Sequence, residues 1–140
     1  MEERPLGGCG LGRLRKKIIG FFLIAWVAST GVASAQDAAA GAHVFLKCKA
    51  CHQIGDNAKN MVGPALTGIV GRPAGTSPDY NYSDANKNSG LTWDEATLKV
   101  YLKDPRAKIP GTKMTFPGLS SETDIDNVIA YLKTFPAPAK

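Results

Sequence analysis

The chain has 140 residues, a length that allows one compact domain at most. It carries 17 Lys and Arg residues against 12 Asp and Glu residues, and five of the basic and two of the acidic residues precede residue 36. From residue 36 onward there are therefore 12 basic and 10 acidic side chains, and this balance gives no support to a nucleic-acid-binding function.

The first predicted element is an N-terminal targeting segment over residues 1–35. Residues 13–17 are rich in Arg and Lys, residues 18–28 are apolar, and residues 33–35 read ASA, the small-x-small pattern of a cleavage site. This order is typical of a secretory signal peptide. An uncleaved membrane anchor is the alternative, since the uncharged run approaches the length that spans a bilayer. Its Ser, Thr and Gly residues favour cleavage after Ala35.

The next predicted element is a helix over residues 38–50, with Val44 and Phe45 on its apolar face. It runs into the sequence KCKACHQ at 47–53. Residues 52–82 then contain eight Gly and Pro residues, a density that predicts a long loop with little regular structure. A loop of this length is uncommon inside a small domain, and wrapping a large ligand would account for it.

Two helices are predicted before a second loop. Ser83 is the predicted N-cap of a short helix over residues 83–89. The sequence TWDE at 92–95 is a capping box that would open a helix ending near Lys103, just before an Asp-Pro pair. Residues 104–119 hold further Gly and Pro residues and predict the second loop.

The last predicted helix begins near Ser121 and ends before Pro136. Its apolar residues recur at the i, i+3, i+4 and i+7 spacing of one helix face, and are Ile125, Val128, Ile129 and Leu132. No stretch after residue 36 alternates as a strand would. The predicted fold class is therefore all-α, with three main helices separated by two large loops.

Cys48, Cys51 and His52 form the main chemical motif of the chain, C-x-x-C-H. A zinc site would need four ligands, and His43 and His52 flank the cysteines at spacings unlike those of zinc fingers. A thioredoxin-like dithiol would need a preceding strand, which the pattern does not predict. The third interpretation, haem attachment, has C-x-x-C-H as its signature. Both thiols would bond to the porphyrin, and the histidine would lie beneath the iron.

Several further segments occur along the chain in a recognisable order, and they are VGPAL at 62–66, YSDANKNSG at 82–90, LTW at 91–93, IPGTKMTF at 109–116 and VIAYLK at 128–133. With CKACH, they make the chain resemble a class I cytochrome c, of the bacterial cytochrome c2 and mitochondrial-type group. The resemblance implies a cytochrome c domain over residues 36–140. Its fold would be all-α, wrapped around one covalent haem c that is tethered through Cys48 and Cys51.

The resemblance also implies His52 and Met114 as the two iron ligands. Met114 lies in a Pro- and Gly-rich loop rather than on an apolar helix face, which favours a ligand over a core residue. A Met/His pair raises the reduction potential and suits the transfer of one electron. The carbonyl of Pro64 would accept a hydrogen bond from His52, and Leu66 would pack on the haem.

Further cofactor-binding residues follow from the same resemblance. Arg72, Tyr82 and Trp93 match positions that hold the haem propionates, where a buried carboxylate needs hydrogen-bond donors. A polar network near the predicted methionine ligand would consist of Asn86, Tyr101 and Thr112.

The predicted partner-docking residues surround the exposed haem edge, and they are Lys47, Arg106, Lys113 and Phe116. Three other positions where the family carries lysines read Met61, Ser120 and Ser121 in this chain. Electrostatic steering toward an acidic partner should therefore be weaker and less dependent on salt.

These features predict a monomeric periplasmic electron carrier without catalytic residues. It would accept an electron from a cytochrome bc1-type membrane complex and pass it to an oxidase, a reaction centre or a reductase through transient contacts. The alternative is a haem enzyme or gas sensor, which would require Met114 to leave the iron readily.

Overall fold

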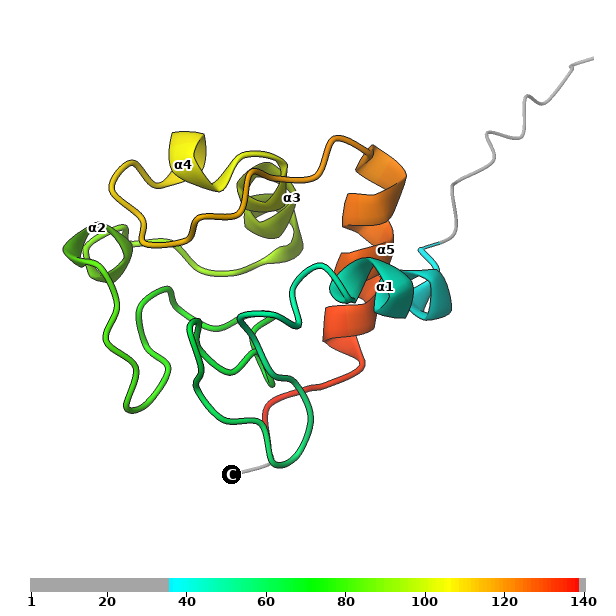
Figure 1. Cartoon of the computed structure of the whole chain (residues 1–140), viewed down its shortest axis with the longest axis horizontal. Helices are drawn as coiled ribbons and strands as arrows, with labels where there is room; N and C mark the ends of the chain where they lie inside the picture. The colour runs from blue at the N-terminus through cyan, green and yellow to red at the C-terminus, as the bar shows by residue number, and fades with distance from the viewer. Residues whose placement is uncertain (1–35, 139–140) are drawn as a thin grey trace, which may run out of the picture. The chain divides into compact units, whose positions relative to one another are not determined.

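The computed structural model describes residues 36–138, which form five helices and no strand. The helices are α1 (Ala38–Phe45), α2 (Asp84–Lys87), α3 (Glu95–Lys103), α4 (Pro105–Lys108) and α5 (Glu122–Lys133) (Figure 1). The targeting segment predicted over residues 1–35 lies outside the described residues. Within them, none of the helices has the length and apolar character needed to cross a membrane.

The first and last helices, α1 and α5, cross in close contact (Figure 1). A β-carbon on Gly41 would lie 1.9 Å from the backbone oxygen of Asn127, so a glycine is needed for the two backbones to approach. Beside this point the ring centroids of Phe45 and Tyr131 lie 5.2 Å apart. The crossing holds α1 against α5, and the two cysteines follow the end of this helix.

Two helices begin at the capping residues that the sequence predicts. Ser83 caps α2, and its side chain accepts a hydrogen bond from the N–H of Asn86. Ser121 caps α5 and accepts from the N–H of Asp124 in the same way. Each serine therefore satisfies a backbone donor that has no partner inside its own helix.

The capping box predicted at 92–95 is wrong, because α3 begins two residues later than it implies. Thr92 is still extended and pairs with Pro73 in an isolated antiparallel bridge. Asp94 is the N-cap instead, and its side chain accepts from the N–H of Thr97. The predicted end of this helix at Lys103 is confirmed.

The first helix is shorter than predicted. The helix predicted over residues 38–50 ends at Phe45, and residues 46–51 continue in turns. The N–H of Leu46 donates to the carbonyl of His43 at 3.2 Å, a three-residue reach that tightens the chain after the helix. The two cysteines therefore lie on turns and not on a helix face.

The second long loop contains a helix that composition did not predict. Helix α4 lies inside the loop predicted at 104–119 and begins with Pro105. Proline is favoured at the first helical position because its missing N–H would have no partner there. The side chain of Asp104 caps the helix by accepting from the N–H groups of Arg106 and Ala107.

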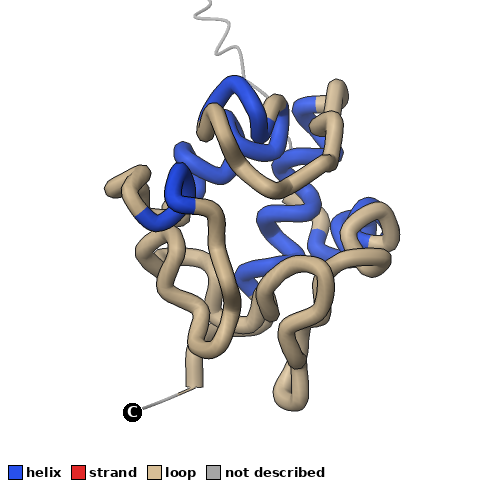
Figure 2. Tube along the Cα trace, turned by 60° about the vertical axis from the view of Figure 1, so that its left-hand side comes forward, coloured by secondary structure: helices blue, strands red, loops and turns tan. Residues whose placement is uncertain are grey.

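The buried core lies among α1, α3 and α5. Its most deeply buried apolar side chains are Phe45, Ile125, Val128 and Ile129. Most of the remaining described chain is loop, drawn in tan in Figure 2, and the longest stretches are residues 46–83 and 109–121. The predicted all-α fold class with large loops is confirmed.

Candidate functional site

The helices and loops enclose a cavity of about 420 Å³, a size suited to a large cofactor. Helices α1, α3 and α5 and both long loops contribute to its walls. Among the apolar side chains that line it are Leu66, Ile69, Leu98, Leu102, Val128 and Leu132.

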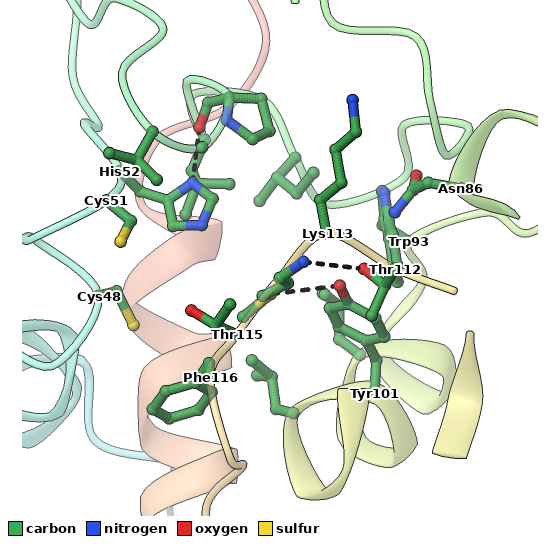
Figure 3. A pocket seen from close by; sticks show the side chains of 18 of the residues that line it. Cys48, Cys51, His52, Asn86, Trp93, Tyr101, Thr112, Lys113, Thr115 and Phe116 are labelled. Atoms are coloured by element: carbon green, nitrogen blue, oxygen red, sulfur yellow. Dashed lines mark hydrogen bonds between the residues drawn. The ribbon is translucent and has the colours of Figure 1, made fainter. Parts of the chain in front are cut away.

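Most of the predicted site residues line this one cavity, and they are Lys47, Cys48, Cys51, His52, Pro64, Leu66, Tyr82, Asn86, Trp93, Tyr101, Thr112, Lys113, Met114 and Phe116. Arg72 and Arg106 are not among the lining residues. In Figure 3 the labelled residues of the C-x-x-C-H motif lie on one side of the pocket, while Tyr101, Thr112 and Asn86 lie on the other.

A tight turn brings Cys48, Cys51 and His52 together at one wall of the cavity. The N–H groups of Cys51 and His52 both donate to the carbonyl of Cys48, at 3.0 and 2.9 Å. Both thiols are free within the described residues. Burial raises the pKa of the Cys48 thiol and nearby Cys51 raises it further, while Lys47 lowers it. The turn thus presents two thiols and an imidazole to the same space.

The ring of His52 is held in one orientation by the loop that follows it. Its Nδ1 lies 2.7 Å from the carbonyl oxygen of Pro64, so Nδ1 carries the hydrogen and donates, and Nε2 keeps its lone pair. Burial lowers the pKa of His52 more than the bond to Pro64 raises it, which favours the neutral ring. A neutral imidazole with one nitrogen engaged in this way is the form that binds metal ions.

Gly63 allows the loop to lie directly against this ring. A β-carbon at Gly63 would be 2.3 Å from Cε1 of His52, closer than any real side-chain contact. The backbone of the loop is also bonded to the motif, because the N–H of Gly63 donates to the carbonyl of Cys51 at 2.8 Å. The ring is therefore packed on one side by backbone alone.

Met114 lies on the second long loop and also lines the cavity. The hydroxyl of Tyr101 donates to Sδ of Met114 at 3.2 Å, and the N–H of Met114 donates to Oγ1 of Thr112 at 3.3 Å (Figure 3). Burial raises the pKa of Tyr101, so its hydroxyl keeps the hydrogen that it donates. These two bonds fix both the side chain and the backbone of Met114.

Two buried polar atoms beside the site have no hydrogen-bond partner among the described residues, Asn86 Oδ1 and Arg72 Nε. Asn86 lines the cavity, whereas Arg72 donates to the carbonyls of Ala65 and Thr67 at 3.1 and 3.4 Å. Arg72 therefore braces the loop that carries Pro64. Buried polar atoms without partners are rare in proteins, so these two indicate that a polar ligand group belongs nearby.

Two aromatic residues expected at the site, Tyr82 and Trp93, are buried and line the cavity. The oxygen of the Tyr82 hydroxyl accepts from the N–H of Ser77 at 3.3 Å, which leaves its own hydrogen available to donate. The Trp93 ring packs against Tyr101 with centroids 4.7 Å apart. Both side chains thus add a polar hydrogen to a lining that is mostly apolar.

Three of the predicted docking residues line the cavity, namely Lys47, Lys113 and Phe116. Nζ of Lys47 lies 3.6 Å from the carboxylate of Asp124. Nζ of Lys113 donates to the carbonyls of Asn81 and Tyr82, at 3.2 and 3.5 Å. Both ammonium groups therefore already have partners within the chain, while Arg106 is exposed on α4.

The cavity also has lining residues that the sequence did not assign to the site, and they are Phe45, Val62, Ile69, Tyr80, Ser83, Leu98, Leu102, Thr115, Pro117, Val128 and Leu132. Several of these belong to apolar helix faces. Their periodicity predicts burial but does not distinguish packing on a helix from packing on a ligand. For Tyr80, the available signal was the pair of tyrosines in the sequence YNY inside a polar loop.

An all-α fold that brings a C-x-x-C-H turn and a methionine loop to one apolar cavity defines a c-type cytochrome. The family model for cytochrome c matches residues 38–136, and the chain belongs to this family. Cytochrome c2 from Rhodoblastus acidophilus is 62% identical to it over 103 residues, which cover 74% of this chain and 96% of that protein. Cytochrome c2 from Blastochloris viridis is 52% identical over 124 residues, covering 89% and 96%.

The structure is likewise similar to that of cytochrome cH from Methylobacterium extorquens. The TM-score is 0.67 at 56% sequence identity, and the match covers 70% of this chain and 98% of that one. The relatives are named as cytochromes, and the family defines the chain as an electron carrier.

Membership of the family assigns one covalent haem c to the chain, with Cys48 and Cys51 in the attachment motif. The residues that line the cavity are chemically suited to a haem group. The lining is mostly apolar, both thiols reach it, and Asn86 offers a buried polar atom without a partner in the described chain. A large flat ring would fill the apolar lining and reach both thiols, whereas Asn86 Oδ1 is an acceptor and needs a hydrogen-bond donor.

Replacing Gly63 with Ala should push the His52 ring away from the Pro64 carbonyl. Because the new β-carbon would overlap the ring, we expect the haem-loaded protein to lose about 1–3 kcal/mol of unfolding free energy. Denaturant unfolding measures this loss, and the NMR resonance of the His52 Nδ1 proton should shift. Ser120→Ala is the control, because this side chain is exposed on a loop away from the His52 ring. An unchanged resonance of the His52 Nδ1 proton in the Gly63→Ala variant would contradict the close packing of Gly63 on the ring.

Proposed function

We propose that this chain is a periplasmic one-electron carrier whose haem iron is bound by His52 and Met114. One observation carries the proposal: an oriented, neutral imidazole and a thioether line the same cavity as the two attachment cysteines. When bound, haem supplies a metal centre that gains and loses one electron. The protein's part is to hold both ligands still, so that few atoms move as the charge changes.

His52 is the proposed proximal ligand through Nε2. The Pro64 carbonyl accepts the Nδ1 proton, which fixes the ring and raises the basicity of the other nitrogen. Leu66 lines the cavity from the same loop and would exclude water from this side. The ligand is thus oriented before the cofactor arrives.

Met114 is the proposed ligand on the opposite side. A thioether is a soft donor that favours reduced iron and so raises the reduction potential. The hydroxyl of Tyr101 occupies one side of the sulfur, and the hydroxyl of Thr112 holds the backbone N–H. Both bonds oppose displacement of Met114, which an enzyme or gas sensor with an open iron position would require.

The haem propionates would need donors in a buried setting, and we propose that Arg72, Tyr82 and Trp93 provide them, with Asn86 completing the polar surroundings. The Tyr82 hydroxyl and the Trp93 indole bring polar hydrogens to the cavity. Nε of Arg72 is buried and has no partner within the described residues. Donors of this kind offset the cost of burying a carboxylate.

Replacing Met114 with Ala should open one side of the iron. We expect this variant to bind carbon monoxide at neutral pH and to have a sharply lower reduction potential, because the thioether no longer stabilises the reduced form. Met61→Ala is the matched control, since Met61 is 46% exposed and is not among the lining residues. Optical spectra and redox titration measure both effects. Carbon monoxide binding by the unaltered protein would contradict ligation by Met114 and favour a haem enzyme or gas sensor.

The proposed partners are redox proteins that bind one monomer transiently at the cavity mouth. A cytochrome bc1-type complex would be the donor, and an oxidase, reaction centre or reductase the acceptor. Lys47, Lys113, Arg106 and Phe116 are the proposed docking residues. Lys47 is paired with the carboxylate of Asp124, which reduces the net positive charge at this surface and supports weak electrostatic steering.

Raising the salt concentration should slow electron transfer from a cytochrome bc1-type complex only slightly. Between about 0.01 and 0.15 M salt the screening length falls from about 30 to about 8 Å. We expect the second-order rate constant, measured by stopped flow, to fall by less than about tenfold, the low end of steering effects.

A variant with added lysines supplies the comparison for this rate. Met61→Lys combined with Ser120→Lys places positive charge at two exposed positions where the family carries lysines. Its rate constant should fall more steeply with salt. Equal salt dependence in the two proteins, or a steep fall in the unaltered one, would contradict weak steering.

We propose that residues 1–35 are a cleaved signal peptide and that residues 36–140 are the cytochrome c domain. The sequence layout supports this division, and the first helix is capped by Asp37, just after the proposed cleavage point. Export to the periplasm follows from such a leader.

The intact mass of protein from a periplasmic extract tests this division. We expect the mass of residues 36–140 plus one covalent haem. A variant with Ala33→Leu and Ala35→Leu should keep the leader, because cleavage requires small residues at these positions. Full-length mass for the unaltered protein, recovered with membranes, would instead identify residues 1–35 as an anchor.

A further inference from the structure

Two side-chain hydrogen bonds tie the loop after the C-x-x-C-H motif to a turn near residue 80. The side-chain amide of Asn60 donates to the carbonyl of Pro78 at 2.8 Å, while its oxygen accepts from the N–H of Ala65 at 3.0 Å. The hydroxyl of Tyr80 donates to the carbonyl of Val62 at 2.6 Å. The tied positions bracket the carbonyl that orients the proximal histidine.

Apolar packing contributes little on the outer side of this loop. Met61 and Val62 are 46% and 74% exposed, so neither is buried in the protein core. The location of the Pro64 carbonyl therefore depends in part on hydrogen bonds to the motif and to the turn, beside those that Arg72 makes to Ala65 and Thr67. Any movement of the turn would be passed through Pro64 to the ring of His52, which lies 2.7 Å from it.

The same turn is tied to the second long loop. Nζ of Lys113 donates to the carbonyls of Asn81 and Tyr82, at 3.2 and 3.5 Å, and Lys113 is the residue before Met114. Asp79, between the tied positions, has a φ of 57°, in the left-handed region that non-glycine residues seldom adopt. Aspartate tolerates this region in turns better than most residues do, so Asp79 suits a tight turn here.

We propose that residues 78–82 form a clasp that couples the two ligand loops across the cavity, with Asn60, Tyr80 and Lys113 as positioning residues. The clasp is a short turn held from both sides, so releasing one side frees the turn and weakens the hold on the other. The inference rests on the proposed iron ligands, because the clasp acts on His52 through the first loop and on Met114 through the second.

Hydrogen exchange in the haem-loaded protein tests the coupling. The His52 Nδ1 proton reports one loop and the Met114 backbone N–H reports the other. Three variants each remove one tie: Lys113→Met keeps the aliphatic stem without the donors, Tyr80→Phe removes the hydroxyl, and Asn60→Asp replaces the donor to Pro78 with an acceptor. Each should accelerate exchange of both protons by about fivefold, the effect of one net hydrogen bond.

The decisive observation is the proton on the far side from each substitution. Lys113→Met should accelerate exchange of the His52 Nδ1 proton, although the substituted residue lies on the other loop. Tyr80→Phe should likewise accelerate exchange of the Met114 backbone N–H. Lys87→Met is the matched control, because this exposed lysine pairs with Asp84 at 3.7 Å outside the clasp, and it should leave both protons unchanged. The N–H of Ile129 in α5 should also be unchanged in every variant.

Two results would overturn the clasp. If each variant accelerated exchange only of the proton on the loop that it directly releases, the ties would be independent. If the Ile129 N–H accelerated by the same factor, the variants would act on global stability and not on the turn. Either failure could occur with both iron ligands intact in the optical spectrum. Failure of the proposed ligation would appear separately, as carbon monoxide binding by the unaltered protein.

Discussion

The constraint on which the rest of this structure depends is that the chain encloses an apolar cavity where a small domain would otherwise place part of its core. Leu98 and Leu102 of α3 and Val128 and Leu132 of α5 line this space as well as packing against the protein. Side chains around a void lose the contacts that close packing provides. The haem that the family assigns to this chain therefore completes the core, and cofactor binding and folding stability are parts of one interaction.

A second consequence of enclosing a cavity is that long loops must be held without regular secondary structure. Backbone groups in such loops still need partners, and here side chains supply many of them. Thr67 both donates to the carbonyl of Gly55 and accepts from its N–H, at 2.6 and 2.9 Å. Asn60 bonds to two separate segments in the same manner. The loops are therefore specified by a few polar side chains, in the way that the helices are specified by their apolar faces.

These two kinds of specification explain what the sequence could predict. Helix α5 was predictable because its periodic apolar face and Ser121 cap are local signals, and the C-x-x-C-H motif was predictable because its spacing is specific. The start of α3 was not, since Thr92 is drawn into a bridge with Pro73 from a distant loop. The position of Arg72 beside the carbonyls of Ala65 and Thr67, and the place of Tyr80 at the cavity, likewise depend on contacts between segments that no local pattern encodes.

The lysines that line the cavity, Lys47 and Lys113, also make contacts within the chain. An ammonium group has three N–H donors, and Lys113 directs its group at two backbone carbonyls. Lys47 is paired with Asp124. Each of these lysines keeps its positive charge but offers a partner less freedom than an unattached lysine would. The weak steering proposed above would follow from the uncharged residues Met61, Ser120 and Ser121, and from the pairing of Lys47 with Asp124. If Lys113 faces a partner as proposed, its bonds to Asn81 and Tyr82 would also give the docking surface a fixed shape, because the same ammonium group holds two loops together.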